Sequence, residues 1–556
     1  MNLRRILLAV LAGLAPAAMP LAAQDLAALA AQRPLVISGS ITSGLASYSS
    51  RGIDARQKPF SWQSSGTVNI SIYGVSLPFS FTLSEKERKF RQPFDQFGLS
   101  PTYRWLTLHG GYRSPAFSPL VFAGQSMLCW GLEMNPWLLR TGFVQGRFQR
   151  AVAEDTLSAV PQTPAFKRTG YAAKLGFGSA DNFTDVALLK ARDDASSLPS
   201  LPVKSQVLPG ENVAFGVSSH YRLFGSLALD LDAGYSAYTR DQRAPSLALP
   251  GNLGSRLVAK FLAPNASTQL TKALQMAAGY RWGVVDLAAD FKRIDPEYRT
   301  MGIAYLSDDV QSWGGRIGWT PLAAVRASAG ITRQRDNLGS AKKATTYKTG
   351  LQSSLSYGTG TAGVDLSYGL AASSQTAGSA PLNDSTALSQ SFHTIGIAPR
   401  LMIPAANGSH TFAGSYLYQF LVDGNAFTRG LSQSHGTIAS LSYTLAAGTA
   451  SVSLGTTLAA LNTSSARSRT ISLAPSASLS FWQRRLALSG NAGYSQSYNG
   501  SSLTGRTINS GLSSQLRPGG PHAISASVSF TRFMAHGSGQ SSFSEVKGDL
   551  SYVVSF

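Results

Sequence analysis

The chain has little charge, a single cysteine and no long apolar run. Only 14% of its 556 residues are charged, well below the roughly 25% that is usual for soluble domains. The single cysteine, Cys129, excludes an intramolecular disulfide. After the N-terminal region, no stretch approaches the ~18–20 consecutive apolar residues that a transmembrane helix needs. The sequence therefore argues against a string of soluble domains and against a helical membrane protein.

Residue spacings typical of enzyme active sites or metal sites are also missing. The seven histidines are scattered, and neither a GxSxG motif, a phosphate-binding loop nor a metal-ligand spacing is present. Serine is so abundant that a serine near a histidine carries little information. We therefore expect no enzymatic activity, no cofactor and no metal site.

The N-terminus has the pattern of an export signal. A basic pair, Arg4 and Arg5, precedes the short apolar stretch 6–14, and small residues follow with a cleavage point after Ala23. This pattern predicts a secretory signal peptide at residues 1–23. Residues 24–36 are then expected to form a short periplasmic lead, helical or disordered.

Basic residues dominate the charge balance. Lysine and arginine number 48 against 28 acidic residues, a net charge of +20. Removing Arg4 and Arg5 with the signal peptide lowers this by 2, to +18. Such a charge favours anionic surroundings, such as lipid head groups or an acidic solute. An exported protein is a poor candidate for nucleic-acid binding.

A two-residue alternation of apolar and polar side chains runs through the rest of the chain. The last residues read KGDLSYVVSF, and one strand face would carry Val546, Gly548, Leu550, Tyr552, Val554 and Phe556. Successive side chains of a strand point to opposite sides, so this pattern predicts a two-faced strand. The same alternation recurs at 227–234, 285–292, 364–369 and 471–481.

Connectors between these strands alternate in length. Short ones, such as 73–74 and 358–361, are followed by long ones, such as 192–211 and 239–268. Roughly ten-residue two-faced strands joined in this way are typical of outer-membrane barrels. We predict an all-β fold: a single large transmembrane antiparallel up-and-down β-barrel of about 24–26 strands, covering residues 37–556. An even strand count would place both chain ends in the periplasm.

The final strand ends on an aromatic residue. Such a strand looks like the recognition signal that the outer-membrane barrel assembly machinery reads. We assign this role to Leu550, Tyr552, Val554 and Phe556. The alternative interpretation is that Phe556 is an aromatic of the membrane interface belt, and the two roles are compatible.

One stretch resembles a known group of proteins. Residues 92–124 read QPFDQFGLSPTYRWLTLHGGYRSPAFSPLVFAG, preceded at 69–84 by NISIYGVSLPFSFTLS. Together they resemble a family of uncharacterised outer-membrane barrel proteins from Bacteroidota and relatives. The resemblance covers roughly the first quarter of the exported chain and implies only fold and location.

The same stretch holds the candidate gating or partner loop. Its aromatic, glycine, serine and proline content favours a loop that folds inward or caps the pore, or a surface loop held by its own aromatics. A basic run just before it could bind lipid phosphate or an acidic partner, or form a solvated loop tip. The candidate residues are Lys86, Arg88, Lys89, Arg91, Phe94, Tyr103, Trp105 and Tyr112.

Charged residues within predicted strands should line the lumen. They would form a charge ladder that steers a solute, or ordinary lumenal ion pairs between neighbouring strands. The candidates are Arg147, Lys174, Asp230, Asp232, Asp286, Asp290 and Lys292.

The functional hypothesis is an integral protein of the outer membrane that acts as a wide gated or partner-occluded channel or export conduit. Barrels of this size leave an aqueous lumen, and we expect no plug domain ahead of this one. We expect the lumen to be closed by 86–118, by 239–268 or by a separate plugging or surface partner. The alternative is a non-transport scaffold or anchor for a surface structure. Other expected partners are outer-membrane lipids, lipopolysaccharide and the barrel assembly machinery.

Overall fold

The structure is a computed structural model of the chain. It describes residues 35–72, 75–84, 98–154, 163–198, 207–247, 253–537 and 541–556. The predicted signal peptide and the lead before residue 35 lie outside these ranges and stay predictions. The first strand begins at Leu35, two residues before the predicted start of the barrel.

The first half of the described chain forms β-strands of mostly 8–13 residues. They are β1 Leu35–Arg51, β2 Phe60–Ile72, β3 Val75–Ser84, β4 Gly98–Leu99, β5 Thr102–Tyr103, β6 Leu106–Arg113, β7 Phe122–Ala123, β8 Met127–Met134, β9 Leu139–Gln149, β10 Lys167–Gly178, β11 Phe183–Asp194, β12 Glu211–Leu223, β13 Leu227–Thr239, β14 Thr268–Trp282 and β15 Val285–Ile294. A short helix, α3 Leu253–Val258, lies between β13 and β14.

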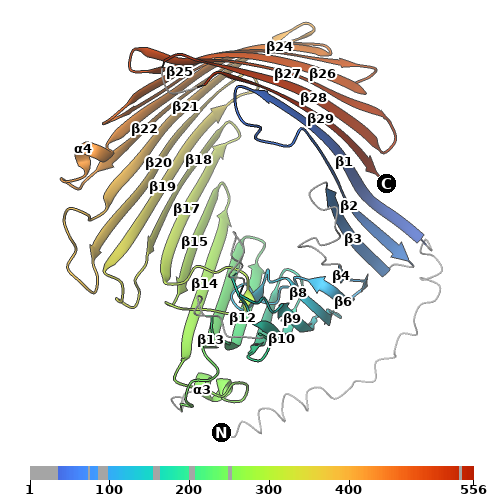
Figure 1. Cartoon of the computed structure of the whole chain (residues 1–556), viewed down its shortest axis with the longest axis vertical. Helices are drawn as coiled ribbons and strands as arrows, with labels where there is room; N and C mark the ends of the chain where they lie inside the picture. Colours follow the sequence, from blue (N-terminus) through green and yellow to red (C-terminus); the bar gives the residue numbers. More distant parts are fainter. Residues whose placement is uncertain are drawn as a thin grey trace.

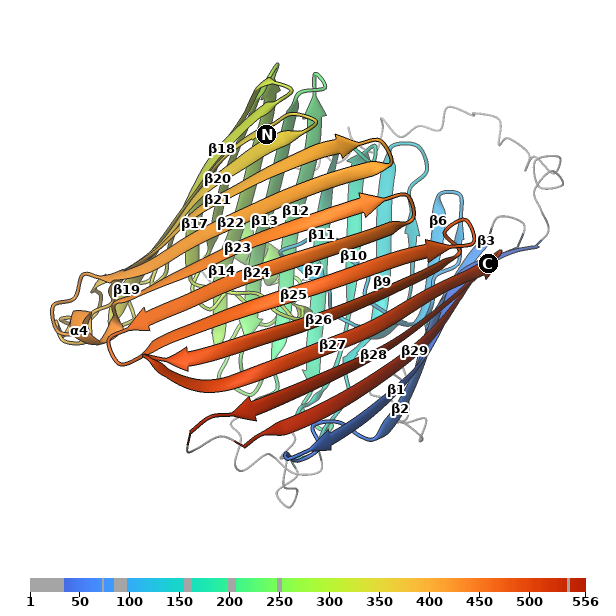
Figure 2. The same ribbon diagram turned by 90° about the horizontal axis from the view of Figure 1, so that it is seen from above.

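The second half continues with strands that are mostly longer (Figure 2). They are β16 Gly302–Ile303, β17 Val310–Leu322, β18 Val325–Arg335, β19 Ala344–Gly358, β20 Ala362–Ala377, β21 Ser389–Ala405, β22 Gly408–Asp423, β23 Ser434–Ala447, β24 Ala450–Thr463, β25 Arg467–Phe481, β26 Leu486–Asn499, β27 Ser502–Gly519, β28 His522–Ala535 and β29 Phe543–Ser555. The helical turn α4 Arg429–Ser432 follows β22.

These strands close into one antiparallel barrel (Figure 1). Each wall strand pairs with its neighbour in sequence, and β1 pairs with β29 to complete the ring. At the junction, the backbones of Gly39 and Phe556 exchange hydrogen bonds of 2.7 and 2.9 Å. Among the described residues the main sheet has 27 named strands. The fragments β4 and β5 share one position between β3 and β6, which leaves 26 positions.

The long connectors all lie at one end of the barrel, and the other end carries only short ones. One end, here called the turn rim, carries tight turns such as 283–284, 323–324 and 448–449, together with both ends of the described chain. The other end, the loop rim, carries long connectors such as 240–267 and 295–309. The even strand count is therefore confirmed. The predicted alternation of connector lengths holds up to β24, after which the loop-rim connectors 464–466 and 500–501 are also short.

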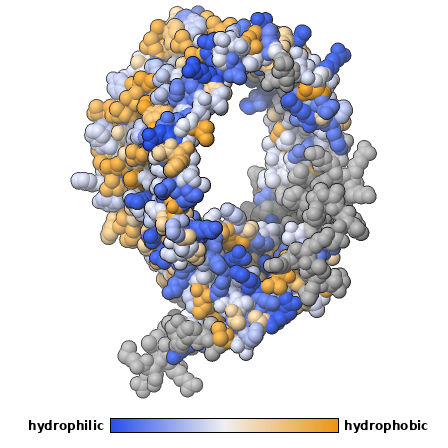
Figure 3. Space-filling model, turned by 60° about the vertical axis from the view of Figure 1, so that its left-hand side comes forward, coloured by the Kyte–Doolittle hydropathy of each residue, from blue (hydrophilic) through white to orange (hydrophobic). Residues whose placement is uncertain are grey.

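The two faces of each strand meet different surroundings. Outward side chains are apolar and exposed, for example Leu287 and Ile317, which are paired through the register of β15 and β17. The neighbouring lumenal positions are polar, as in the Arg281–Asp286 ion pair of 2.7 Å between β14 and β15. Figure 3 shows this division, with hydrophobic residues over the outer wall and hydrophilic residues around the opening. The alternation of the C-terminal strand is confirmed, with Leu550 and Tyr552 on the outward face.

The connector between β13 and β14 is described at 240–247 and 253–267, and its second part packs against the outside of the barrel. Its Val258 and Leu262 are buried against Val213 of β12 and Ala237 of β13, which are outward positions in the strand register. The carbonyl of Phe261 accepts a hydrogen bond from the outward-facing Lys190. For the described residues, the prediction that 239–268 closes the lumen is therefore wrong, because Val258 and Leu262 cover the wall from outside.

Charge placed on the outward face should be penalised far more than charge placed in the lumen. We expect Leu550→Arg to destabilise the barrel in a bilayer by about 2–4 kcal/mol, the cost of a cation on a lipid-facing strand. The matched control Ser551→Arg points its side chain into the lumen and should change stability little. Folding into lipid vesicles at graded urea concentrations measures both values. Equal losses for the two variants would contradict the assignment of faces.

Candidate functional site in the lumen

A connector from the loop rim turns into the barrel between β6 and β8. Within 114–126, the side chains of Phe117, Leu120, Val121 and Phe122 are 4% exposed or less. Leu120 packs with Ala273, Ile294, Tyr298 and Val310, and the other three pack on lumenal residues of five consecutive strands. These wall residues are Met127, Cys129, Val144, Phe148, Ala172, Ala187, Leu189 and Ala214. An apolar segment is thus buried inside a barrel whose lumen is otherwise polar.

A second connector, 295–309, joins the first. Its short strand β16 pairs in parallel with β7, Gly302 opposite Phe122. The Tyr298 hydroxyl donates to the carbonyl of Leu120 at 2.7 Å, and Thr300 Oγ1 donates to the carbonyl of Val121 at 2.8 Å. Burial raises the pKa of Tyr298, so its hydroxyl stays a donor. We call the two connectors, 114–126 and 295–309, the inner shelf.

Asn212 of β12 fixes the inner shelf to the wall. Its Oδ1 accepts a hydrogen bond from the Met301 backbone at 3.0 Å, and its Nδ2 donates to Ser236 Oγ at 2.8 Å. Ser236 in turn donates to the carbonyl of Arg299 at 2.5 Å. Both Asn212 and Ser236 are fully buried. Leaving a buried amide unpaired costs free energy, so this network holds the shelf in one place.

Glycines on the lumenal face make room for the inner shelf. A Cβ at Gly234 would lie 2.3 Å from the Tyr298 hydroxyl, and one at Gly216 would lie 2.7 Å from Val121 Cγ2. A Cβ at Gly142 would lie 2.9 Å from the Phe117 ring. Real Cβ contacts are never so short, so any larger residue at these three wall positions would collide with the inner shelf.

Asp309 links the inner shelf to the next rim connector. Its carboxylate accepts hydrogen bonds from the backbones of Asn337 (3.0 Å) and Leu338 (2.7 Å), and it lies 2.5 Å from Lys342 Nζ. Burial alone would raise the pKa of Asp309, but the bonds from Lys342, Leu338 and Asn337 outweigh it and lower the pKa below its usual value. The ionised form of Asp309 therefore stabilises this link.

Polar residues line the wall beside the shelf. Glu133 of β8 lies 3.0 Å from Lys174 Nζ and 3.1 Å from His109 Nε2. Ser100 Oγ lies 2.8 Å from the other ring nitrogen of His109. Lys174 also lies over the ring of Phe117 at 5.1 Å. Glu133 is thus neutralised by a lysine, and the cluster anchors the edge of the shelf through a cation–π contact.

Six of the seven predicted lumenal charges face the lumen, by strand register. Lys174, Asp230 and Asp286 are paired with Glu133, His220 and Arg281 respectively. Asp232, Asp290 and Lys292 lie on the same face. These pairs fit the expected alternative of cross-strand ion pairing.

The seventh predicted lumenal charge, Arg147, was placed wrongly. It is opposite Leu128 in the register and donates to the outward-facing Tyr112 at 3.1 Å. Its neighbours Val144 and Phe148 face inward instead, because the inner shelf makes this part of the lumen apolar.

The predicted gating loop is also corrected where it is described. Tyr103 lies in β5, Trp105 in the tight turn before β6, and Tyr112 on the outward face of β6. They belong to the wall and not to a lumenal loop. Lys86, Arg88, Lys89, Arg91 and Phe94 lie outside the described residues. The segment that turns inward is 114–126. Its apolar run FSPLVFAG is the sequence feature that could have identified it.

The described residues leave the lumen open beside the inner shelf. Figure 3 looks through the ring and shows a clear opening. In Figure 1 the shelf lies against the wall near β12 and β13, on one side of the ring only. The described helices include none long and apolar enough to cross a membrane.

No family model matches the sequence, and no curated protein matches it. Among solved structures, the chain is similar to the outer membrane protein OpdK from Pseudomonas aeruginosa, with 13% identity, a TM-score of 0.31, and coverage of 63% of this chain and 94% of that chain. OccAB4 from Acinetobacter baumannii shows 12% identity, a TM-score of 0.31 and coverage of 69% and 97%. The translocation pore of the P pilus usher PapC shows 12% identity, a TM-score of 0.36 and coverage of 94% and 99%. Structural similarities this low support no inference about function.

A small side chain at Gly234 should loosen the inner shelf without opening the barrel. We expect Gly234→Ala to destabilise the shelf by about 1–3 kcal/mol, the usual cost of overpacking, because its methyl group would collide with Tyr298. Gly279→Ala is the control, since a Cβ there meets nothing closer than 3.9 Å. Hydrogen exchange of 295–309 measures the effect. Equal protection in both variants would contradict the account of the shelf.

The link through Asp309 should weaken in acid. Folding lowers the pKa of this carboxyl, so its ionised form stabilises the folded state at any pH above the pKa of the unfolded state. This stabilisation is lost as the pH falls through the pKa of the folded state. Exchange in 295–309, corrected for intrinsic rates, should therefore rise below about pH 4. Asp309→Asn should show that faster exchange already at pH 7. The control is Asp384→Asn, which removes an exposed carboxylate from the connector between β20 and β21. The same behaviour in both variants would refute the link.

Proposed function

We propose that the protein is an integral channel of the bacterial outer membrane, with a wide lumen that the inner shelf narrows from one side. The observation that carries this proposal is a closed barrel with an apolar outer wall, a polar lumen and an opening beside the shelf. Closure of the barrel gives the backbone amide and carbonyl groups hydrogen-bond partners within a bilayer. The polar lumen supplies a hydrated path. The loop rim would face the outside of the cell and the turn rim the periplasm.

The lumenal charges favour weak ion selectivity. Arg140 lies 2.8 Å from Asp185, and Arg168 lies 2.8 Å from Asp193, so these cations are largely neutralised in place. The net positive charge of the chain should then give a modest preference for anions. The substrate class therefore includes small anionic solutes without strong discrimination.

Two earlier expectations remain part of this proposal. The outward residues Leu550, Tyr552, Val554 and Phe556 would be read by the barrel assembly machinery before β29 joins β1. The resemblance to Bacteroidota proteins also stays a prediction. The alternative function, a scaffold for a surface structure, requires a partner that fills the opening.

Planar bilayer recording of the purified protein tests the channel. We expect steady conductance with slight anion preference, and larger or noisier openings for Gly234→Ala because its shelf is displaced. Gly279→Ala should behave like the unmodified protein. A barrel that is folded, as shown by heat-dependent migration in gels, but is electrically silent would overturn the channel and favour the scaffold.

A further inference from the structure

Outward-facing arginines lie in the half of the wall nearest the loop rim. Strand register places Arg293, Arg333 and Arg335 on the outward face near that rim. By contrast, Arg281, Arg326 and Arg400, which lie near the turn rim, face the lumen. An outward guanidinium near one rim can attract an anionic lipid head group, and the arrangement places this attraction in one leaflet only.

Two of these arginines form a cluster with polar and aromatic neighbours. Arg335 donates through Nε and Nη2 to Gln311 Oε1 at 3.1 and 2.8 Å. The Arg333 guanidinium lies 5.5 Å from the centre of the Tyr347 ring. Together with Trp313 these residues line a hollow of about 190 Å³ on the outer wall. Among the described carboxylates, none forms an ion pair with Arg333 or Arg335. We call these residues the arginine cluster.

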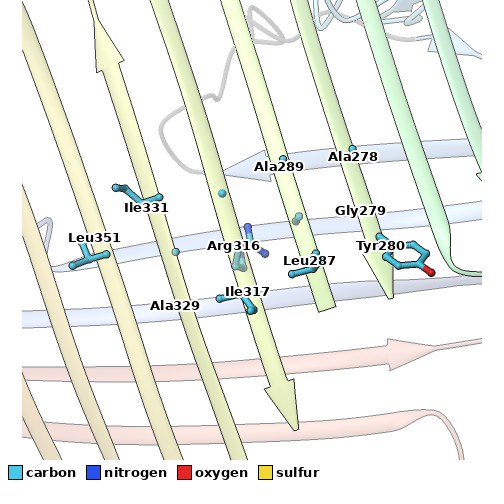
Figure 4. Close-up of a pocket in the computed structure, with 13 residues that line it drawn as sticks. Ala278, Gly279, Tyr280, Leu287, Ala289, Arg316, Ile317, Ala329, Ile331 and Leu351 are labelled. Carbon is cyan, nitrogen blue, oxygen red and sulfur yellow. The ribbon is translucent and has the colours of Figure 1, made fainter. Parts of the chain in front are cut away.

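An apolar groove lies directly below the arginine cluster on the same strands. Its floor is Ala278, Ala289 and Gly315, which are opposite one another in the register of β14, β15 and β17. Larger residues, among them Leu287, Ile317 and Ile331, border it and leave a volume of about 480 Å³. Figure 4 shows these side chains on one side of the strands, with Arg316 behind them on the lumenal side. We call this hollow the acyl groove.

The two features are continuous. Ile331 at the top of the acyl groove and Arg333 in the arginine cluster are two residues apart on one face of β18, a separation of about 7 Å. Trp313 of β17 is paired with Arg333, and tryptophan is a residue enriched at membrane–water interfaces. A ligand that fits both parts has an anionic head and a hydrocarbon chain.

We propose that this face binds a phosphorylated glycolipid of the leaflet at the loop rim, a molecule of the lipid A type. Its phosphate would accept hydrogen bonds from Arg333 and Arg335, whose planar guanidinium groups match phosphate geometry. One acyl chain would fill the acyl groove over Gly315. This inference rests on the proposed placement in the outer membrane, and it gives the protein one specific lipid site in addition to its general lipid contacts.

The head-group contact is tested by titrating lipid A into the purified protein and counting bound lipids by native mass spectrometry. We expect the double variant Arg333→Gln, Arg335→Gln to bind at least about tenfold more weakly, because two charge-assisted hydrogen bonds are lost. Arg469→Gln is the matched control: Arg469 is also an outward arginine near the loop rim and lies over Tyr498 at 4.8 Å. The same lipid without phosphate should lose the same affinity. Equal binding by the double variant and the control would overturn the proposal.

The acyl contact has an independent test. Gly315→Leu should fold, because a Cβ there meets nothing within 4 Å, and its side chain would fill the groove. We expect weaker binding of lipid A with the arginines intact, and unchanged binding would restrict the site to the head group and overturn the groove. Conductance is recorded on the same preparations. If the barrel conducts but binds lipid A no better than the arginine double variant does, only the lipid site is overturned. If the barrel binds lipid A but does not conduct, only the channel is overturned.

Discussion

Backbone hydrogen bonding is the constraint on which the rest of this structure depends. A strand inside a bilayer has no water with which to satisfy its amide and carbonyl groups, so each edge must find a partner. The pairing of β1 with β29 removes the last two edges. Once the ring is closed, each strand has one face directed outward and one toward the lumen. The composition of the chain follows from this division, with many small polar residues, few charges and apolar residues spread at every second position.

The inner shelf is a local exception to that division. Where it lies, the lumenal wall is largely apolar or glycine, with Asn212 and Ser236 as buried polar anchors, and Arg147 of β9 points outward. Phe148 of β9 lies 6.0 Å from Phe122, edge to ring, in a position that would be hydrated elsewhere in the barrel. The shelf is therefore a second layer of structure, packed like the core of a soluble protein against one side of the wall.

This exception also explains what the sequence could and could not predict. The strand period, the alternating connectors, the even count and six of the seven lumenal charges follow from local patterns. Arg147 was misplaced because the rule that polar residues face the lumen fails where 114–126 covers the wall. The partner of that segment, 295–309, lies far away in the sequence, and only the closed ring brings Tyr298 to Leu120. Likewise, a long connector such as 240–267 carries no local sign of the face on which it will fold.

The one-sided position of the inner shelf divides the barrel mechanically. From β8 to β17 the wall is backed by packed side chains and by the hydrogen-bond network of Asn212. From β18 to β29 the described wall is a single layer of long, tilted strands (Figure 2). A single sheet bends more easily than a sheet with a packed layer behind it. A lateral force on the barrel would therefore deform the β18–β29 arc, while the backed arc keeps its curvature and acts as the rigid frame.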